Sequence, residues 1–277
     1  MAEITAATVK ALRERTGLPM MDCKKALVET DGDPEAAVDA LRKKGIKTQE
    51  TKMGTRDTST GRMGVYADFE GGMSAMVELQ CESAPVASHE EFISLANDLA
   101  KQLATGPGAA TPEELLEQAS PSNSGTLREQ KDDLYNRIRE VFNLSRILRI
   151  DGSCGSYAHH AGVTKGVLLE VTGGNAEAAK DICMHIAAMN PTAVCKDDLD
   201  PELVAREREI LVEAARGEGK PEQIIDKMVD GRMRQFYAQQ VLEEQPFVKD
   251  DKQTVGKYAE AAEMKLVRFV TWELGKE

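Results

Sequence analysis

The sequence predicts an α+β protein made of an N-terminal three-helix domain and two related subdomains of antiparallel sheet and helix. Gly and Pro divide residues 1–45 into short helical segments. Two pairs of strand-like segments follow, and each pair leads into an amphipathic helix. The two pairs agree in order and length, which indicates a duplication. A chain of 277 residues has room for two or three small domains rather than one large core.

Residues 1–45 are predicted to form three short helices. Gly17 stands just past the first helix and Pro19 just inside the second, which is the usual placement of these residues at helix ends. The Asp33-Pro34 pair supplies an N-cap and a first-turn proline for the third helix. That helix is expected to end at Gly45.

Two adjacent methionines, Met20 and Met21, occupy the first turn of the second helix. Neighbouring helical positions point in different directions, so both side chains cannot enter the core of so small a domain. At least one is expected to face solvent, where an unbranched thioether can adapt its shape to a partner protein. On spacing alone, the alternative that both methionines fill the small core is equally favoured.

A linker and the first sheet subdomain follow. Residues 46–62 are rich in Lys, Thr, Ser and Gly with little apolar content, so they are predicted to form a linker. The first subdomain is placed at residues 63–143. Its expected elements are the strands Met63–Phe69 and Ser74–Cys81, joined as a hairpin, and the helices His89–Ala104 and Leu127–Phe142.

The second subdomain, residues 144–277, repeats the first. The run GVYA at 64–67 recurs as GSYA at 155–158, and a second hairpin again leads into an amphipathic helix. Residues 200–237 are predicted to be an inserted pair of antiparallel helices with narrow apolar stripes, a short coiled-coil arm. The last segment, Met264–Leu274, is expected to return as a strand to the second sheet.

Composition indicates the kind of partner. The net charge of −12 argues against direct nucleic-acid binding, because a phosphate backbone would repel the chain and no Lys/Arg cluster offsets the repulsion. A partner protein is the better expectation. No run approaches the length of about 18 apolar residues that a membrane span needs. The N-terminus resembles neither a secretory nor a transit peptide, so no membrane partner is expected and the chain is predicted to be cytoplasmic.

No catalytic, metal or cofactor site is predicted. The five cysteines form no C-x-x-C pair and their number is odd, which indicates neither a zinc site nor a disulfide framework. Phosphate-binding loops and the H-E-x-x-H motif are absent. Cys81 with His159 or His160 is the one nucleophile-and-base pairing that the sequence allows. The favoured alternative is a thiol at the end of a sheet and loop histidines, with His160 an unengaged surface residue.

Several runs of the sequence resemble the elongation factor Ts family. They are MAEITA at 1–6, RERTGLPMMDCKKA at 13–26, GD at 32–33, GKP at 219–221 and QPFV at 245–248. The resemblance implies an N-terminal domain similar to a ubiquitin-associated (UBA) module and a core built as a pseudo-duplicated pair of sheets. It also implies that Arg13, Met20 and Met21 contact the nucleotide domain of elongation factor Tu.

The loop after the first hairpin is implied to form a second contact. In this family the loop carries a Thr-Asp-Phe-Val motif whose aromatic ring wedges into elongation factor Tu on the Mg²⁺ side of its nucleotide pocket. The corresponding run here is Ser83-Ala84-Pro85-Val86, with Ala84 and Pro85 where the family has Asp and Phe. Proline is expected to hold Ala84 extended and to stiffen the tip. His159 matches a family histidine near the same interface.

The resemblance therefore implies an exchange factor that binds GDP-bound and nucleotide-free elongation factor Tu. It would promote GDP release without covalent catalysis. Two other functions stay open on the sequence. One is a UBA-like adaptor whose core has lost exchange activity, which the Ala84-Pro85 departure leaves open. The other is a cysteine-dependent enzyme that uses Cys81.

Overall fold

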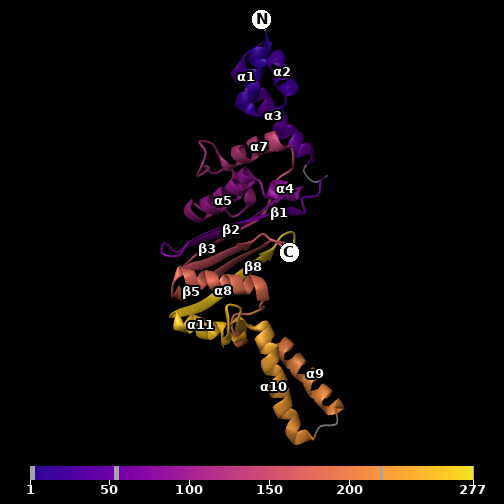
Figure 1. Ribbon diagram of the computed structural model, residues 1–277, viewed down its shortest axis with the longest axis vertical. Coiled ribbons are helices and arrows are strands. Elements are labelled where there is room, and N and C mark those ends of the chain that lie inside the picture. The colour runs from indigo at the N-terminus through magenta and orange to yellow at the C-terminus, as the bar shows by residue number, and fades with distance from the viewer. Residues whose placement is uncertain (1–3, 53–55, 219–220, 277) are drawn as a thin grey trace.

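The computed structural model describes residues 4–52, 56–218 and 221–276 (Figure 1). The N-terminal three-helix unit comprises α1 (Ala6–Thr16), α2 (Met20–Glu29) and α3 (Pro34–Lys52). A capping box between Thr5 and Thr8 begins α1, and Gly17 ends it at φ 69°. The apolar core of this unit is small and consists of Val9, Leu12, Leu18, Cys23, Ala26, Leu27, Ala37 and Leu41.

The third helix is longer than the sequence predicts. The prediction that it ends at Gly45 is wrong, because α3 runs on through the first part of the expected linker. Gly45 serves packing instead. A Cβ there would lie 1.7 Å from Oδ1 of Asn136 in α7 (Leu127–Ile138), so a larger residue would displace the Asn136 side chain. Residues 53–55 of the expected linker lie outside the described residues, as do 219–220 of the GKP motif.

The first sheet has the order β1-β2-β3, with antiparallel pairing throughout. Its strands are β1 (Thr60–Asp68), β2 (Met73–Cys81) and β3 (Asn143–Asp151). The first two confirm the predicted hairpin, although β1 begins inside the expected linker. β3 was not predicted, and it lies in the range expected for the second subdomain. The first sheet unit therefore extends to Asp151.

Helices cover the outer face of this sheet (Figure 1). They are α4 (Ala84–Ala87), α5 (Glu90–Thr105), α6 (Pro112–Leu116) and α7. The predicted helix from His89 is confirmed, with His89 itself as the N-cap of α5. The predicted helix that ends at Phe142 is shorter in the structure. It ends at Ile138, because Arg139 adopts the left-handed conformation at φ 68°.

The second sheet has the order β4-β5-β8, again antiparallel. Its strands are β4 (Cys154–His159), β5 (Lys165–Gly173) and β8 (Met264–Glu273), and β8 confirms the predicted returning strand. Smaller elements complete the unit: α8 (Ala176–Met189), α11 (Val255–Ala261), β6 (Pro246–Phe247), β7 (Asp250–Thr254) and two 3₁₀ turns at Lys196–Asp198 and Leu242–Glu244.

Equivalent glycines relate the two sheet units. A Cβ on Gly64 in β1 would lie 2.2 Å from the carbonyl oxygen of Ala96 in α5. A Cβ on Gly155 in β4 would lie 2.6 Å from the backbone of Ala179 in α8. In each unit a glycine on the first strand therefore lets the following helix approach the sheet closely.

Equivalent ion pairs relate the units as well. Both middle strands carry a β-bulge, one at Glu78 in β2 and one at Glu170 in β5. Glu78 meets Arg146 of β3 at 2.7 Å, and Glu170 meets Arg268 of β8 at 2.6 Å. The duplicated pattern in the sequence thus corresponds to a duplicated architecture.

The two sheets pack face to face, which gives the core the layer order helix, sheet, sheet, helix (Figure 1). Alternate residues of each middle strand face the helices or the opposite sheet. The layer between the sheets is closed by Met76, Ile150, Cys154 and Leu168. The three-helix unit lies beyond the helices of the first sheet (Figure 1).

A helical hairpin, α9 (Pro201–Gly217) and α10 (Glu222–Gln240), projects from the second sheet unit (Figure 1). It lies at the end of the molecule away from the three-helix unit. Pro201 begins α9 as predicted. The two helices pack through the cluster Ala215, Ile225, Val229 and Met233. Within the described residues, every helix is too short or too polar to span a membrane.

Candidate partner-binding site

The first turn of α2 presents two methionines to solvent. Met20 is 41% exposed and Met21 is 62% exposed, whereas the opposite face of α2 is buried. The alternative that both fill the core is therefore wrong. Arg13 is exposed in the last turn of α1. Sequence analysis missed Val28, which is 57% exposed, although its i, i+7 spacing from Met21 places both on one face of α2.

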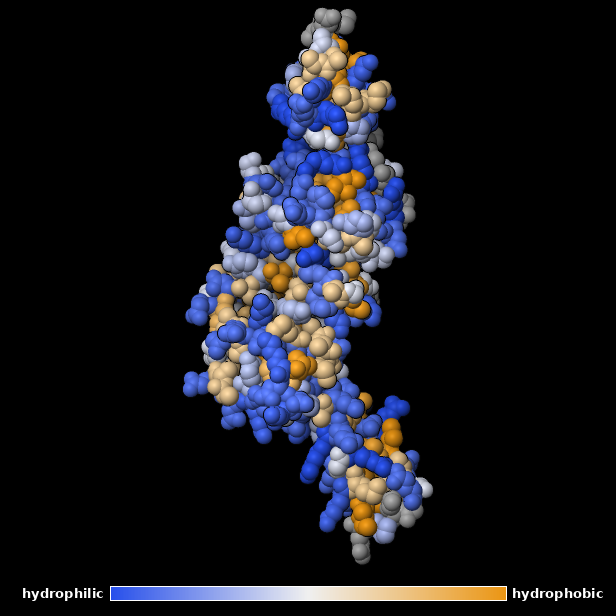
Figure 2. All heavy atoms as spheres, in the orientation of Figure 1, coloured by the Kyte–Doolittle hydropathy of each residue, from blue (hydrophilic) through white to orange (hydrophobic). Residues whose placement is uncertain are grey.

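Apolar side chains reach the surface at both ends of the molecule. Figure 2 shows them on the three-helix unit and on the helical hairpin, and it also shows apolar groups among the polar atoms of the core between. On the hairpin the exposed apolar residues include Leu203, Ile210 and Ile224. Scattered apolar residues are normal on a protein surface. Met20 and Met21 differ from these in being adjacent, so two exposed thioethers lie at the start of one helix.

The run Ser83–Val86 begins a short helix and is not an extended tip. Ser83 is extended and caps α4, with Pro85 in the first turn. The expectation that Ala84 is extended is wrong. A proline is tolerated in the first helical turn, because its missing N–H would have no intrahelical partner there. Ala84 and Pro85 are exposed, while Val86 is buried in the core of the first sheet unit.

The segment that follows α7 fastens the start of α4. Glu140 accepts hydrogen bonds from the Ser83 backbone N–H at 3.1 Å and from Ser83 Oγ at 2.7 Å. Glu82 accepts a hydrogen bond from the Val141 N–H at 2.8 Å. Each segment therefore supplies a carboxylate that pairs with the backbone of the other, which fixes the two together.

His159 and His160 lie at the end of β4. Nδ1 of His159 is 3.0 Å from the Tyr157 hydroxyl. His160 is half-buried, so the expectation of a surface residue is wrong, although its Nδ1 has no hydrogen-bond partner among the described residues, as expected of an unengaged residue. Burial, the charge of Arg62 and the neighbouring His159 lower the pKa of His160 to about 4. Arg62 also donates a hydrogen bond to the Ala87 carbonyl at the end of α4, at 3.4 Å. The ends of β4 and α4 thus both lie near Arg62.

Cys81 does not have the surroundings of a nucleophile. It is fully buried, and its thiol donates a hydrogen bond to the Ser83 carbonyl at 3.3 Å. Burial raises the pKa of the thiol to about 11. Among the described residues, no group of three or more His, Cys, Asp or Glu side chains is placed to hold a metal ion.

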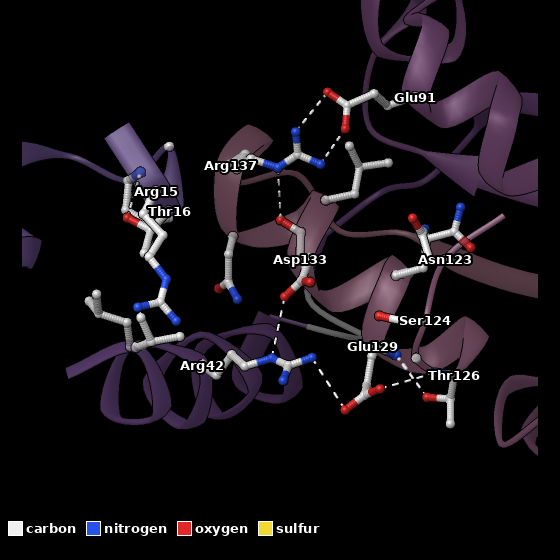
Figure 3. Close-up of a pocket in the computed structure, with 18 of the residues that line it drawn as sticks. Arg15, Thr16, Arg42, Glu91, Asn123, Ser124, Thr126, Glu129, Asp133 and Arg137 are labelled. Atoms are coloured by element: carbon white, nitrogen blue, oxygen red, sulfur yellow. Dashed lines mark hydrogen bonds and ion pairs between the residues drawn. The ribbon is translucent and has the colours of Figure 1, made fainter. Parts of the chain in front are cut away.

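A polar groove of about 900 Å³ lies between the three-helix unit and the first sheet unit (Figure 3). Arg42 of α3 pairs across it with two carboxylates of α7, Glu129 at 3.3 Å and Asp133 at 3.4 Å. Arg137 of α7 forms a bidentate pair with Glu91 of α5. These arginines are already neutralised by carboxylates, so the ion pairs join helices to one another.

A further ion pair reaches α2 itself. Arg139, directly after α7, lies 3.1 Å from the carboxylate of Asp22. Both side chains are about one-third exposed, at 36% and 31%. Asp22 follows Met20 and Met21 in the first turn of α2. The first sheet unit is therefore anchored to the three-helix unit at a point next to Met20 and Met21.

Known proteins match this chain over its length. The sequence profile of the family described as "Elongation factor TS" matches residues 82–276. The chain is 43% identical to elongation factor Ts of Methylococcus capsulatus over 277 residues, which covers 99% of this chain and 92% of that protein. It is 41% identical to elongation factor Ts of Azoarcus sp. over 278 residues, with coverage of 100% and 92%. The Clostridium botulinum (strain Eklund 17B) protein of that name is 40% identical over 287 residues, with coverage of 99% and 93%.

Proposed function

The chain belongs to the elongation factor Ts family, and from that premise we propose that it binds elongation factor Tu and accelerates GDP release. Identity of about 40% over nearly the whole of each relative supports the same activity in this chain. The observation that carries the proposal is the pair of exposed methionines within the family signature. We place this activity in the cytoplasm, with the rest of translation.

The proposed mechanism rests on differential binding. If the factor binds nucleotide-free elongation factor Tu more tightly than the GDP form, it must lower the affinity for GDP by the same ratio. A coupling of about 3 kcal/mol corresponds to roughly 150-fold. Such coupling needs contacts that change between two states of the partner. It needs no reactive side chain, which agrees with the burial of Cys81.

Two surfaces are proposed to make these contacts. Arg13, Met20 and Met21 would dock on the nucleotide domain, with the thioethers adapting to its surface. The exposed start of α4, Ala84 and Pro85, would press toward the Mg²⁺ and phosphate side of the nucleotide pocket. Displacement of Mg²⁺ would weaken GDP binding, because the ion is among the largest local charges beside the diphosphate.

An adaptor that binds without exchange remains the second candidate, and one observation favours it. The exposed positions of α4 carry a methyl group and a pyrrolidine ring, Ala84 and Pro85, which insert less apolar area than a phenylalanine.

His159, at the end of β4, is proposed to support the interface with elongation factor Tu from the second sheet unit.

The test is stopped-flow release of a fluorescent GDP analogue from the cognate elongation factor Tu. The wild-type chain should accelerate release in a saturable manner. Arg13→Ala combined with Met20→Ala and Met21→Ala should weaken binding at least about tenfold, which needs a total cost of only about 1.4 kcal/mol from the three truncations. Thermal stability should stay near that of the wild type, because these side chains are exposed.

Matched variants separate the candidates. Leu27→Ala, on the buried face of the same helix, should lower stability by about 2–5 kcal/mol, which calibrates the fold readout. Pro85→Gly should slow release modestly, and Ala84→Asp with Pro85→Phe should equal or exceed the wild-type rate. Tight binding by a chain that leaves GDP release unchanged would establish the adaptor instead. If the Arg13→Ala, Met20→Ala, Met21→Ala variant unfolds, the three side chains support the fold and the proposal that they dock on the partner is refuted.

A further inference from the structure

Two adjacent residues, Arg139 and Glu140, connect the two surfaces that are proposed to contact elongation factor Tu. Nη2 of Arg139 lies 3.1 Å from Oδ2 of Asp22, which directly follows Met21 in the first turn of α2. Glu140 accepts two hydrogen bonds from Ser83, the N-cap of α4, at 3.1 and 2.7 Å. One dipeptide therefore contacts the start of both helices.

The backbone at Arg139 makes this double contact possible. Arg139 is the C-cap of α7, at φ 68° and ψ 20°. A residue other than glycine adopts this left-handed conformation at a cost of about 1–2 kcal/mol. The chain changes direction there, so consecutive side chains reach different units. A strained residue that forms a specific long-range ion pair points to a role for the side chain itself.

A second set of bonds stiffens the same segment. Glu82 accepts a hydrogen bond from the Val141 N–H at 2.8 Å, and its other carboxylate oxygen pairs with Arg56 at 2.7 Å. The residues on both sides of the Glu140–Ser83 contact are thus anchored. Carboxylate bonds to backbone N–H groups are among the stronger hydrogen bonds in proteins. The start of α4 has little freedom to move relative to the end of α7.

We propose that Arg139 and Glu140 form a positioning bridge that sets the separation of the α2 and α4 starts, so that both engage one partner molecule together. The proposal rests on the proposed function, because it concerns how the same two surfaces act. When two contacts belong to one rigid body, formation of the first raises the effective concentration of the second. The bridge would act through Met20, Met21, Ala84 and Pro85 without touching the nucleotide.

The first test is Arg139→Gly, measured by GDP release from elongation factor Tu over a range of factor concentrations. Glycine suits the left-handed backbone, so the melting temperature should stay unchanged or rise. Loss of the ion pair with Asp22 should raise the half-saturating concentration by up to about fivefold, the upper end of the range for a partly exposed ion pair. The maximal release rate should change little. If Arg139 only supported the fold, a variant with an unchanged or higher melting temperature would not bind elongation factor Tu more weakly.

The second test acts on the other half of the bridge. Glu140→Ala removes both bonds to Ser83 and should lower the maximal release rate more than it raises the half-saturating concentration. Glu140→Gln keeps an acceptor for the Ser83 N–H and should restore most of that rate. The charge exchange Asp22→Arg with Arg139→Asp should recover affinity that either single reversal loses.

A control ion pair lies far from both surfaces. Asp230 meets Arg208 in the helical hairpin at 3.2 Å, and Asp230→Asn should leave both kinetic parameters at wild-type values. Wild-type acceleration together with unchanged parameters in Arg139→Gly and Glu140→Ala would overturn the bridge and leave the proposed function standing. If the wild type binds elongation factor Tu without accelerating release, the proposed function fails. The bridge is then judged by the dissociation constants of the same variants, and constants equal to that of the wild type overturn it.

Discussion

The thiol of Cys81 shows how burial sets the chemistry of one side chain. Its pKa of about 11 means that only about one molecule in a thousand carries a thiolate at pH 8. We predict that iodoacetamide at pH 8 leaves Cys81 unmodified in the native protein. Cys195, the only cysteine that is not fully buried, should react first. Peptide mass spectrometry of native and urea-unfolded samples would measure this. Rapid modification of Cys81 in the native protein would favour the alternative function of a cysteine-dependent enzyme.

At His160 the direction of the pKa shift fixes a pH dependence. Its pKa is about 4 in the folded protein, against about 6.5 in the unfolded chain. The unfolded chain therefore binds a proton between pH 6.5 and 4 that the folded protein does not, so the free energy of unfolding falls as the pH drops through this window. Burial lowers the pKa of His185 in the same direction.

We predict that His160→Gln makes this acid-side loss of stability shallower. Urea unfolding at pH 7, 5.5 and 4 would measure the slope for both proteins. Above pH 7 the wild type and the variant should show the same pH dependence, since the imidazole is then neutral in both states. Parallel curves from pH 7 to pH 4 would show that the folded protein protonates His160 normally.

At the scale of elements, the helical hairpin is an appendage on the second sheet unit. Val204 of α9 and Phe236 of α10 pack on the same cluster at the base of the hairpin, so removal of the outer part leaves a short gap. We predict that a Gly/Ser linker in place of residues 205–235 leaves the second sheet folded, with a melting temperature within a few degrees of wild type. Unfolding followed by the fluorescence of Trp272 in β8 would measure this.

The matched control for that replacement removes more of the hairpin. Val204, Phe236 and Tyr237 pack on the cluster that includes Ala193 and Val241. A linker that also removes these three side chains exposes the cluster and should destabilise the second sheet unit. If the shorter replacement already abolishes cooperative unfolding, the hairpin belongs to the core.

Local signals predicted most of the elements. Gly17 and Pro19 mark the joint between α1 and α2, and apolar strand-like segments mark both hairpins and β8. β3 escaped prediction because Arg146 and Arg149 interrupt its apolar pattern. Arg146 pairs with the distant Glu78, and Arg149 pairs with the nearby Asp151 and also donates to two distant carbonyl groups, those of Leu103 in α5 and of Gly106. A sequence does not display such partners, so the strand resembled a polar segment.

Features of the candidate site that depend on neighbouring residues could be predicted, and those that depend on the tertiary fold could not. Adjacency on a small domain predicts that at least one of Met20 and Met21 faces solvent, and the structure exposes both. The link between Asp22 and Arg139 joins residues 117 positions apart, so it depends on the tertiary fold. The left-handed turn at Arg139 was missed for a related reason. Glycine is the usual signal for that conformation, and here an arginine adopts it.

At the scale of the whole molecule, one copy of the duplicated ion pair joins the two sheet units. Glu78 is almost fully buried, and Arg146 also donates to the Glu273 carbonyl of β8 at 2.9 Å. The guanidinium lies 4.5 Å from the centre of the Trp272 ring. The equivalent Arg268 is 60% exposed.

We predict different costs for the two equivalent substitutions. Arg146→Ala leaves a buried carboxylate without its counter-charge and should lower the free energy of unfolding by about 2–3 kcal/mol. Arg268→Ala, at a surface pair, should cost about 0–1 kcal/mol. Denaturant unfolding of both variants would measure the difference, and Trp272 fluorescence should change only in Arg146→Ala. Equal costs would mean that the ion pair between β2 and β3 does not join the units.

The small core of the three-helix unit has a consequence for how long a complex lasts. A unit of about 45 residues buries too little apolar surface for high stability of its own, so it is expected to unfold locally before the layered core. Its backbone amides should exchange with deuterium first in the free protein and slow down when a partner is bound. A surface that belongs to the least stable unit can dissociate by local opening, without loss of the fold elsewhere. Residence time on the partner would then follow the folding equilibrium of residues 4–45.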